Sequence, residues 1–179
     1  HIMFSARKFI EVATFRSGRN NSTSSKGMVL RDNFYGSLED DVFRRDFTIN
    51  GLYFDLQNSE VIDYVGGLDD LKKLQINMIG NPSERFEEDP VRMIRAVRFK
   101  AKLKATIDPN LIKSILNNAH LIENIPPARL YEEVIKLFHN ENSLEVFREL
   151  SNLGILKYLF PETTEDEFIS ASLINTSQR

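Results

Sequence analysis

The arrangement of apolar residues changes at Gly66-Gly67, and this change limits the folds that the chain can adopt. Before the two glycines, apolar residues alternate with polar ones over short stretches, as in strands that bury one face. After them, apolar residues recur at helical spacing almost to the end of the chain. The sequence therefore predicts an α+β protein, with a mixed sheet up to about residue 80 and helices beyond it.

Three strands are predicted before the change, at residues 9–15, 49–56 and 60–64. The first places Glu11 on the same face as Phe9 and Phe15, where a carboxylate is costly unless it is paired or bound to a metal. A tight turn at residues 57–59 joins the other two strands into a hairpin. Residues 16–36 are rich in Ser, Asn, Gly and basic residues, which predicts a long loop.

Start signals mark several of the predicted helices. An Asp-Pro pair, in which aspartate caps the helix and proline takes its first position, precedes two of them, and a Pro-Pro pair precedes a third. A turn is expected at residues 81–83. The predicted helices cover residues 68–74, 89–104, 108–119, 126–139, 143–150 and 153–160.

Composition excludes several kinds of site. The chain has no cysteine, and its three histidines lack the spacing of metal ligands, which excludes disulfides and thiolate or histidine metal centres. No apolar run approaches the ~20 residues that span a bilayer. We therefore expect no membrane attachment and a cytoplasmic location. Because the net charge is −3, binding to RNA would require local basic surfaces.

A basic stripe is predicted on the helix that starts near Asp89. Its members fall within about 120° of one another at the helical turn of about 100° per residue, and they are Arg92, Arg95, Arg98 and Lys102. Arginine suits phosphates and base edges because its planar group donates two parallel hydrogen bonds. An alternative interpretation is a structural network in which the arginines pair with Glu87, Glu88, Glu132 or Glu133.

A second charged cluster precedes the predicted hairpin. Arg44, Arg45 and Asp46 stand together, and Asn50 follows them inside the predicted strand. Two cations, a carboxylate and an amide suit a triphosphate and a ribose. The alternative is a solvated strand entrance without a ligand.

Two glycines mark the junction of the predicted sheet and the predicted helices. Asp63 lies near the end of a strand, and Gly66 and Gly67 follow it. Glycine permits a sharp turn or the close approach of another backbone. The pattern favours a hinge, which would affect opening and closing of a site.

Six strings resemble, in order, the consecutive motifs of the bacterial poly(A) polymerases and the related CCA-adding enzymes of the class II nucleotidyltransferase superfamily. They are EVATFR, LRDNFYGS, RRDFTIN, DYVGGLDDL, IGNPSERFEEDPVRMIRAVRF and IPPARLYEE. The resemblance implies transfer of AMP from ATP to an RNA 3′ end, with release of pyrophosphate. The second and sixth strings favour poly(A) addition. The alternatives are a CCA-adding enzyme and a non-catalytic RNA-binding module on the same scaffold.

The resemblance also implies roles for individual residues. Glu11 matches the third of three carboxylates that hold two Mg²⁺ ions in the family. Contacts with the nucleotide are implied for Arg44, Arg45, Asp46 and Asn50, and base reading for Glu88, Asp89 and Arg92. The stripe residues assigned to RNA are Arg95, Arg98 and Lys102. Asp63, Gly66 and Gly67 would form a flexible joint, and Arg129 and Glu133 would brace the base-reading turn.

The other two carboxylates of the family belong to an Asp-x-Asp motif that this sequence lacks. We therefore expect the chain to start inside a domain and to be inactive alone, because one carboxylate cannot fix two Mg²⁺ ions. Residues 1–80 are expected to be a partial head domain, residues 81–161 a helical neck and the start of a body, and residues 162–179 a linker or truncated tail. The incomplete sheet would favour association with the rest of the domain or with another copy.

Overall fold

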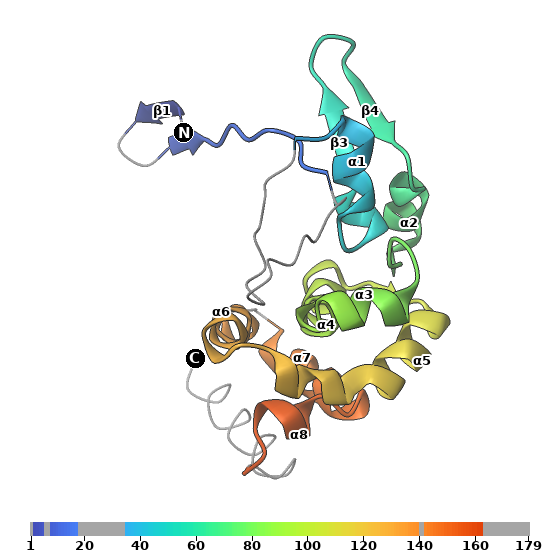
Figure 1. Ribbon diagram of the computed structural model, residues 1–179, viewed down its shortest axis with the longest axis vertical. Helices are drawn as coiled ribbons and strands as arrows, with labels where there is room; N and C mark the ends of the chain where they lie inside the picture. The colour runs from blue at the N-terminus through green and yellow to red at the C-terminus, as the bar shows by residue number, and fades with distance from the viewer. Residues whose placement is uncertain (1, 6–7, 18–34, 140–141, 163–179) are drawn as a thin grey trace, which may run out of the picture. The chain divides into compact units, whose positions relative to one another are not determined.

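The computed structural model describes residues 2–5, 8–17, 35–139 and 142–162. It divides into two compact units, His1–Arg45 and Asp46–Arg179, and its mixture of helices and short strands confirms the predicted α+β class (Figure 1). Most of the predicted loop at residues 16–36 and nearly all of the predicted tail lie outside the described residues.

The first unit contains a short antiparallel pair of strands, β1 (Ile2–Ser5) and β2 (Lys8–Ile10). The strand predicted at residues 9–15 is wrong beyond Ile10, because residues 11–15 are exposed and their alternation buries no face. Helix α1 (Leu38–Phe43) was not predicted. Its N-terminus is fixed by Ser37, whose hydroxyl accepts from the backbone of Asp40 while the Asp40 side chain accepts from the backbone of Ser37.

The second unit opens with a turn and a hairpin. The 3-10 helix η1 (Thr48–Asn50) precedes β3 (Leu52–Asp55), which pairs antiparallel with β4 (Glu60–Asp63). The predicted hairpin is therefore confirmed. Its first strand starts three residues later than expected, because residues 48–50 turn and the Gly51 N–H donates to the Thr48 carbonyl at 2.9 Å.

Helices make up most of the rest of this unit. They are α2 (Gly67–Lys73), α3 (Pro82–Glu88), α4 (Val91–Leu103), α5 (Pro109–Asn118), η2 (Ala119–Asn124), α6 (Pro127–Phe138), α7 (Ser143–Asn152) and α8 (Leu156–Leu159). The starts of α4, α5 and α6 lie within two residues of those predicted from their proline pairs.

Two local predictions fail for reasons that the structure makes plain. The turn predicted at residues 81–83 is the start of α3, where the Asn81 side chain accepts from the Ser83 N–H at 3.0 Å. The helix predicted at residues 153–160 is shorter, because Gly154 adopts a left-handed φ of 67° that ends α7. Neither η2 nor the two-residue strands at residues 75–76 and 106–107 were predicted.

Strands β5 (Gln75–Ile76) and β6 (Thr106–Ile107) form a short parallel pair. The Thr106 N–H donates to the Leu74 carbonyl at 2.8 Å, and the Asp108 N–H donates to the Ile76 carbonyl at 3.1 Å. Helices α3 and α4 lie in the connection between the two strands. Strands of two residues carry no periodicity that a sequence could reveal.

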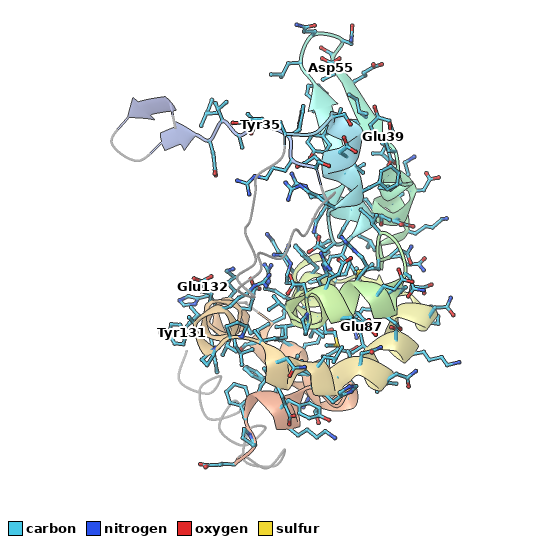
Figure 2. All side chains as sticks on the ribbon, in the orientation of Figure 1. Tyr35, Glu39, Asp55, Glu87, Tyr131 and Glu132 are labelled. Atoms are coloured by element: carbon cyan, nitrogen blue, oxygen red, sulfur yellow. The ribbon has the colours of Figure 1, made fainter. Side chains whose placement is uncertain are left out.

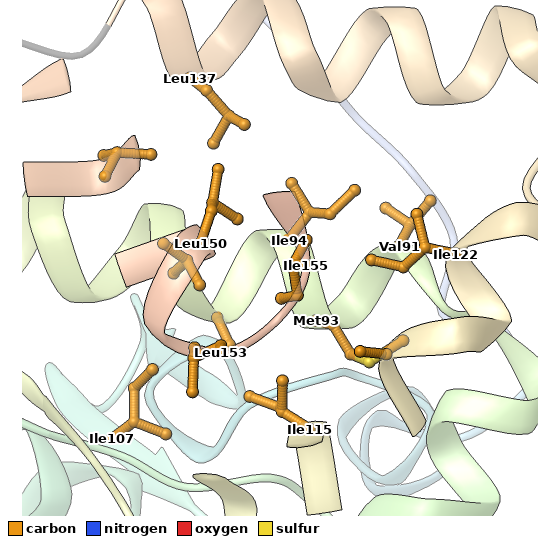
Figure 3. Packing of buried hydrophobic residues seen from close by; sticks show 14 of the residues in the cluster. Val91, Met93, Ile94, Ile107, Ile115, Ile122, Leu137, Leu150, Leu153 and Ile155 are labelled. Carbon is orange, nitrogen blue, oxygen red and sulfur yellow. The ribbon is translucent and has the colours of Figure 1, made fainter. Parts of the chain in front are cut away.

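The core of the second unit surrounds α4 (Figure 3). The buried face of α4 carries Val91, Met93, Ile94, Ala96, Val97 and Ala101. Leu111 and Ile115 of α5, Leu137 of α6 and Leu150 of α7 belong to the same cluster of buried side chains. Each large apolar side chain buried here contributes about 1.5–3 kcal/mol. The core therefore fixes α4, and its opposite face carries the arginines of the basic stripe.

Candidate functional site

Asp46 forms a buried acceptor at the start of the second unit. Its residue is 8% exposed. One carboxylate oxygen accepts from the Phe47 N–H and from the Asn50 side-chain amide, both at 2.9 Å. The other accepts from Nε of Arg95 on α4 at 2.6 Å. Such charge-assisted bonds are roughly twice as strong as neutral ones. Asp46 thus links the turn at residues 46–50, which we call the Asp46–Asn50 turn, to α4.

The Asp46–Asn50 turn is also held through its backbone. The Ile79 N–H donates to the Asp46 carbonyl at 2.9 Å, and the Thr48 N–H donates to the Asn77 carbonyl at 3.0 Å. Phe47 between them is fully buried. The turn therefore presents its side chains from a fixed frame.

Asp63 caps the start of α2. Its carboxylate accepts from the backbone N–H groups of Val65, Gly67 and Leu68 at 2.9–3.0 Å. Burial raises the pKa of Asp63, but these hydrogen bonds outweigh it and hold the pKa below its ordinary value of 3.8. Gly66 adopts a left-handed φ of 76°, which glycine accepts without strain.

A second candidate element lies where α3 meets α4, at Glu88, Asp89 and Arg92, and we call it the α3–α4 junction (Figure 1). Arg92 donates through one nitrogen to the Glu88 carboxylate at 2.9 Å and to the Arg85 carbonyl at 2.6 Å. Arg85 also donates to Glu88, at 2.7 Å. Glu88 is half exposed, whereas Arg92 is mostly buried along its side chain. The junction therefore holds one guanidinium in a defined direction.

Asp89, the next residue, is held from another helix. Its Oδ2 accepts from Nη2 of Arg129 on α6 at 2.5 Å, and its Oδ1 accepts from the Val91 N–H at 3.3 Å. The junction thus carries an arginine fixed by a glutamate beside an aspartate fixed by an arginine. A hydrogen-bond donor, Arg92, and an acceptor, Asp89, are thus held three residues apart at the junction.

The basic stripe on α4 divides into paired and exposed members. Nε of Arg98 lies 3.6 Å from Oε2 of buried Glu133, and neither atom has a hydrogen-bond partner among the described residues. Oε1 of Glu133 accepts from Lys136 at 2.7 Å. Burial lowers the pKa of Arg98, although Glu133 opposes this shift. Lys102 is exposed and forms no ion pair within the part of the chain that the structure describes.

The alternative interpretation of the stripe thus has structural counterparts. Glu88 pairs with Arg92, and Glu133 lies beside Arg98. Glu87 and Glu132, both labelled in Figure 2, are exposed. Two arginines of the stripe therefore have the kind of acidic partner that the structural interpretation expects.

The first unit contains the remaining candidates. Asp41, which is 2% exposed, accepts from both Arg44 and Arg45. Nε of Arg44 is 2.7 Å from one oxygen of Asp41, and Nη2 of Arg45 is 2.8 Å from the other. Glu11 is exposed and follows the end of β2. A single buried carboxylate therefore orients two adjacent cations.

The described residues contain neither a cluster of metal ligands nor a membrane-spanning helix. No group of three or more His, Cys, Asp and Glu side chains in these ranges is placed to hold a metal ion. The same residues form no helix that is both long and apolar enough to cross a membrane.

Comparison with known proteins decides the family. Residues 1–77 match the model "Poly A polymerase head domain", and residues 105–167 match "Probable RNA and SrmB-binding site of polymerase A". Poly(A) polymerase I of Salmonella typhi is 47% identical over 172 residues, which cover 92% of this chain. The chain belongs to the family of poly(A) polymerases and CCA-adding enzymes. It spans 37% of the length of that relative and 43% of the length of its Haemophilus influenzae counterpart, to which it is 41% identical over its whole length.

Other members of the family are also similar. The CCA-adding enzyme of Limosilactobacillus reuteri is 42% identical over 141 residues, covering 79% of this chain and 35% of the enzyme. The crystal structure of the Bacillus stearothermophilus CCA-adding enzyme in complex with CTP aligns with a TM-score of 0.69 and 34% identity. That alignment covers 75% of this poly(A) polymerase family chain and 34% of the enzyme.

Two acidic residues of this family member were missed from the sequence. Asp41 stands three and four residues before the arginines it binds, and this helical spacing is a signal that could have revealed it. Asp70 accepts from Thr48 at 2.6 Å across 22 residues, which no local pattern indicates.

Proposed function

We propose that the protein transfers AMP from ATP to the 3′ end of RNA and releases pyrophosphate. The observation that carries the proposal is the α3–α4 junction, where Glu88 holds Arg92 and Arg129 holds Asp89. An adenine edge offers a donor next to an acceptor, and a fixed Asp and Arg can complement it. The identity with poly(A) polymerase I sequences supports this choice of base and reaction.

Contacts with the rest of the nucleotide are proposed for two other groups of residues. Arg44 and Arg45 suit the triphosphate, because Asp41 orients both guanidinium groups without covering them fully. Asp46 and Asn50 suit the ribose, whose hydroxyl groups can donate to a carboxylate and accept from an amide. A hinge role for Asp63, Gly66 and Gly67 remains a prediction.

Magnesium is proposed as the metal of the reaction, with Glu11 as one ligand. Such an ion would neutralise charge on the phosphate oxygens. Among the described residues, no group of three or more His, Cys, Asp and Glu side chains is placed to hold a metal ion. Arg92, the Asp46–Asn50 turn and Arg44 are instead proposed to bind and orient ATP.

RNA binding is proposed for the basic stripe, through Arg95, Arg98 and Lys102. The exposed ammonium group of Lys102 supports a phosphate contact. The matched description of residues 105–167 as a probable RNA-binding site supports RNA as the partner.

The test is nucleotide incorporation by the complete protein. RNA substrates lacking a terminal CCA would be incubated with ATP alone or with CTP plus ATP. We expect repeated AMP addition with ATP alone. Addition of a single CCA triplet, dependent on CTP, would instead favour the CCA-adding enzymes, whose structural similarity makes them the second candidate. Binding of RNA without any incorporation would favour a non-catalytic module.

Two substitutions test the proposed residue roles in the same assay. Arg92→Ala should weaken selection of ATP over other nucleotides, and unchanged selection would remove the base-reading role. Glu11→Ala should abolish incorporation while nucleotide binding persists. Retained turnover would contradict a metal role for Glu11.

A further inference from the structure

Helix α2 contacts the Asp46–Asn50 turn through a side chain with no assigned role. Oγ1 of Thr48 donates to Oδ2 of Asp70 at 2.6 Å, a short bond to an ionised acceptor. Thr48 is a buried residue and Asp70 is half-buried. The bond joins positions 22 residues apart, so it fixes the turn against a helix that begins beyond the hairpin.

Gly67 allows the backbone of α2 to approach the Thr48 carbonyl closely. A Cβ at this position would lie 2.2 Å from the Thr48 carbonyl oxygen and 3.1 Å from Cδ2 of Leu52. Only a residue without a side chain allows the two backbones to approach in this way. Since Asp63 holds the Gly67 N–H, the backbone of α2 is fixed where it meets Thr48.

Thr48 lies between the two residues proposed to bind the ribose. Its carbonyl accepts from the Gly51 N–H at 2.9 Å, which closes the turn that carries Asn50. The Asn50 amide in turn donates to Asp46 at 2.9 Å. A shift of Thr48 would therefore move Asn50 and disturb the hydrogen bond between its amide and the Asp46 carboxylate.

We propose that Asp70 is a positioning residue for nucleotide binding, acting through Thr48 on Asn50 and Asp46. The inference rests on the proposed function, because it assigns the nucleotide to the Asp46–Asn50 turn. Asp70 does not touch the nucleotide in this scheme. It sets the turn, with Gly67, in the conformation that receives the ribose.

The experiment compares Asp70→Asn with Asp69→Asn in the complete protein. Asp69 is the matched control, because it lies on the same helix and its side chain is 72% exposed. Among the residues that the structure describes, its one ion pair is with Lys72, at 3.4 Å. Both variants remove one negative charge. We expect the ATP dissociation constant and the KM for ATP to rise about tenfold in Asp70→Asn. Asp69→Asn should match the unsubstituted protein.

A merely structural role would change other quantities as well. The proposal expects the KM for RNA to stay within about twofold while the KM for ATP rises. Thr48→Val should reproduce the effect of Asp70→Asn, and the double variant should add little, since both remove the same bond. Thr48→Ser keeps the hydroxyl and should restore most of the affinity. If Asp70→Asn fails to fold, the Thr48→Val and Thr48→Ser pair carries the test.

Two outcomes would overturn the inference. One is an ATP affinity of Asp70→Asn equal to that of Asp69→Asn, and the other is a Thr48→Ser variant as weak as Thr48→Val. ATP affinity is measured by equilibrium dialysis with labelled ATP, which does not require incorporation. Lack of AMP incorporation by the unsubstituted protein would contradict the proposed function alone. Lack of ATP binding would contradict both.

Discussion

The Asp46–Asn50 turn and the α3–α4 junction both join charged side chains, but the carboxylate at the centre of the turn is buried, whereas each ion pair of the junction has one exposed partner. Asp46 is 8% exposed and its partners include a backbone N–H, whereas the side chains of Glu88 and Arg129 are 51% and 44% exposed. Buried bonds cannot exchange with water without a large cost, while exposed ion pairs exchange easily. The turn is thus preset by folding, whereas each ion pair that orients a side chain of the junction keeps one partner in contact with solvent.

This difference predicts a large stability loss when the turn loses its carboxylate. Asp46→Ala leaves Arg95, the Asn50 amide and the Phe47 N–H without their acceptor. We expect the free energy of unfolding to fall by about 3 kcal/mol. Denaturant titration of the chain measures it, with Asp69→Ala as an exposed control that should change stability by less than about 0.5 kcal/mol. Equal losses of unfolding free energy in Asp46→Ala and Asp69→Ala would show that the buried carboxylate contributes no more to stability than an exposed one.

Substitutions at Gly66 and Gly67 distinguish the energetic cost of a left-handed φ from the cost of crowding the Thr48 carbonyl. Gly67→Ala would force Cβ against the Thr48 carbonyl, and we expect a loss of about 2 kcal/mol. At Gly66 no atom lies within 4 Å of the added Cβ, so the left-handed φ alone should cost Gly66→Ala about 1 kcal/mol. Thermal unfolding of both variants ranks them. The reverse order would show that the contact with Thr48 yields easily.

Because Asp63 caps α2 next to the Asp46–Asn50 turn, the stability of the folded chain should depend on pH. Because the pKa of Asp63 is lower in the folded chain than its ordinary 3.8, its contribution is present above that pH and disappears as pH falls through the folded value. Asp63→Asn should therefore lower stability by about 1 kcal/mol at neutral pH. The difference from the unsubstituted chain should shrink progressively below pH 3.8. Unfolding curves at several pH values measure it, and a constant difference would contradict the sign.

The smallest stability effect is expected at the junction, where function should change instead. Glu88→Gln removes an exposed partner of Arg92 and should change the free energy of unfolding by about 0.5 kcal/mol or less. Selection of ATP over CTP should nevertheless fall by roughly tenfold, about 1.4 kcal/mol, because Arg92 loses its orientation. Competition between labelled nucleotides measures this ratio. A large stability loss with intact selection would invert the comparison.

Local signals in the sequence predicted the parts of the fold that local interactions determine. The proline pairs at Asp89-Pro90, Asp108-Pro109 and Pro126-Pro127 mark helix starts, because the fixed φ of proline suits the start of a helix. At α5 the Asp108 side chain also caps the helix. Alternation located the hairpin for the same reason. It failed at residues 11–15, where a pattern suited to a buried strand lies on an exposed segment.

The site was only partly predictable because its decisive contacts are distant in sequence. Arg95 reaches Asp46 across 49 residues, and Arg129 reaches Asp89 across 40. The basic stripe identified the first arginine but not its partner. Resemblance to family motifs identified Arg129, whereas spacing alone would not. Asp70 carries no signal, since its neighbour Asp69 has the same chemistry and points to solvent.

The parallel pairing of β5 with β6 has a consequence for engineering. The two strands enclose α3 and α4 in the chain, and neighbouring strands lie only about 5 Å apart. The segment that we propose to select the base therefore leaves and re-enters the rest of the unit at nearly the same place. Such a segment is suited to exchange between relatives. The exchanged segment needs to match the paired strands β5 and β6 and the residues that contact the buried face of α4.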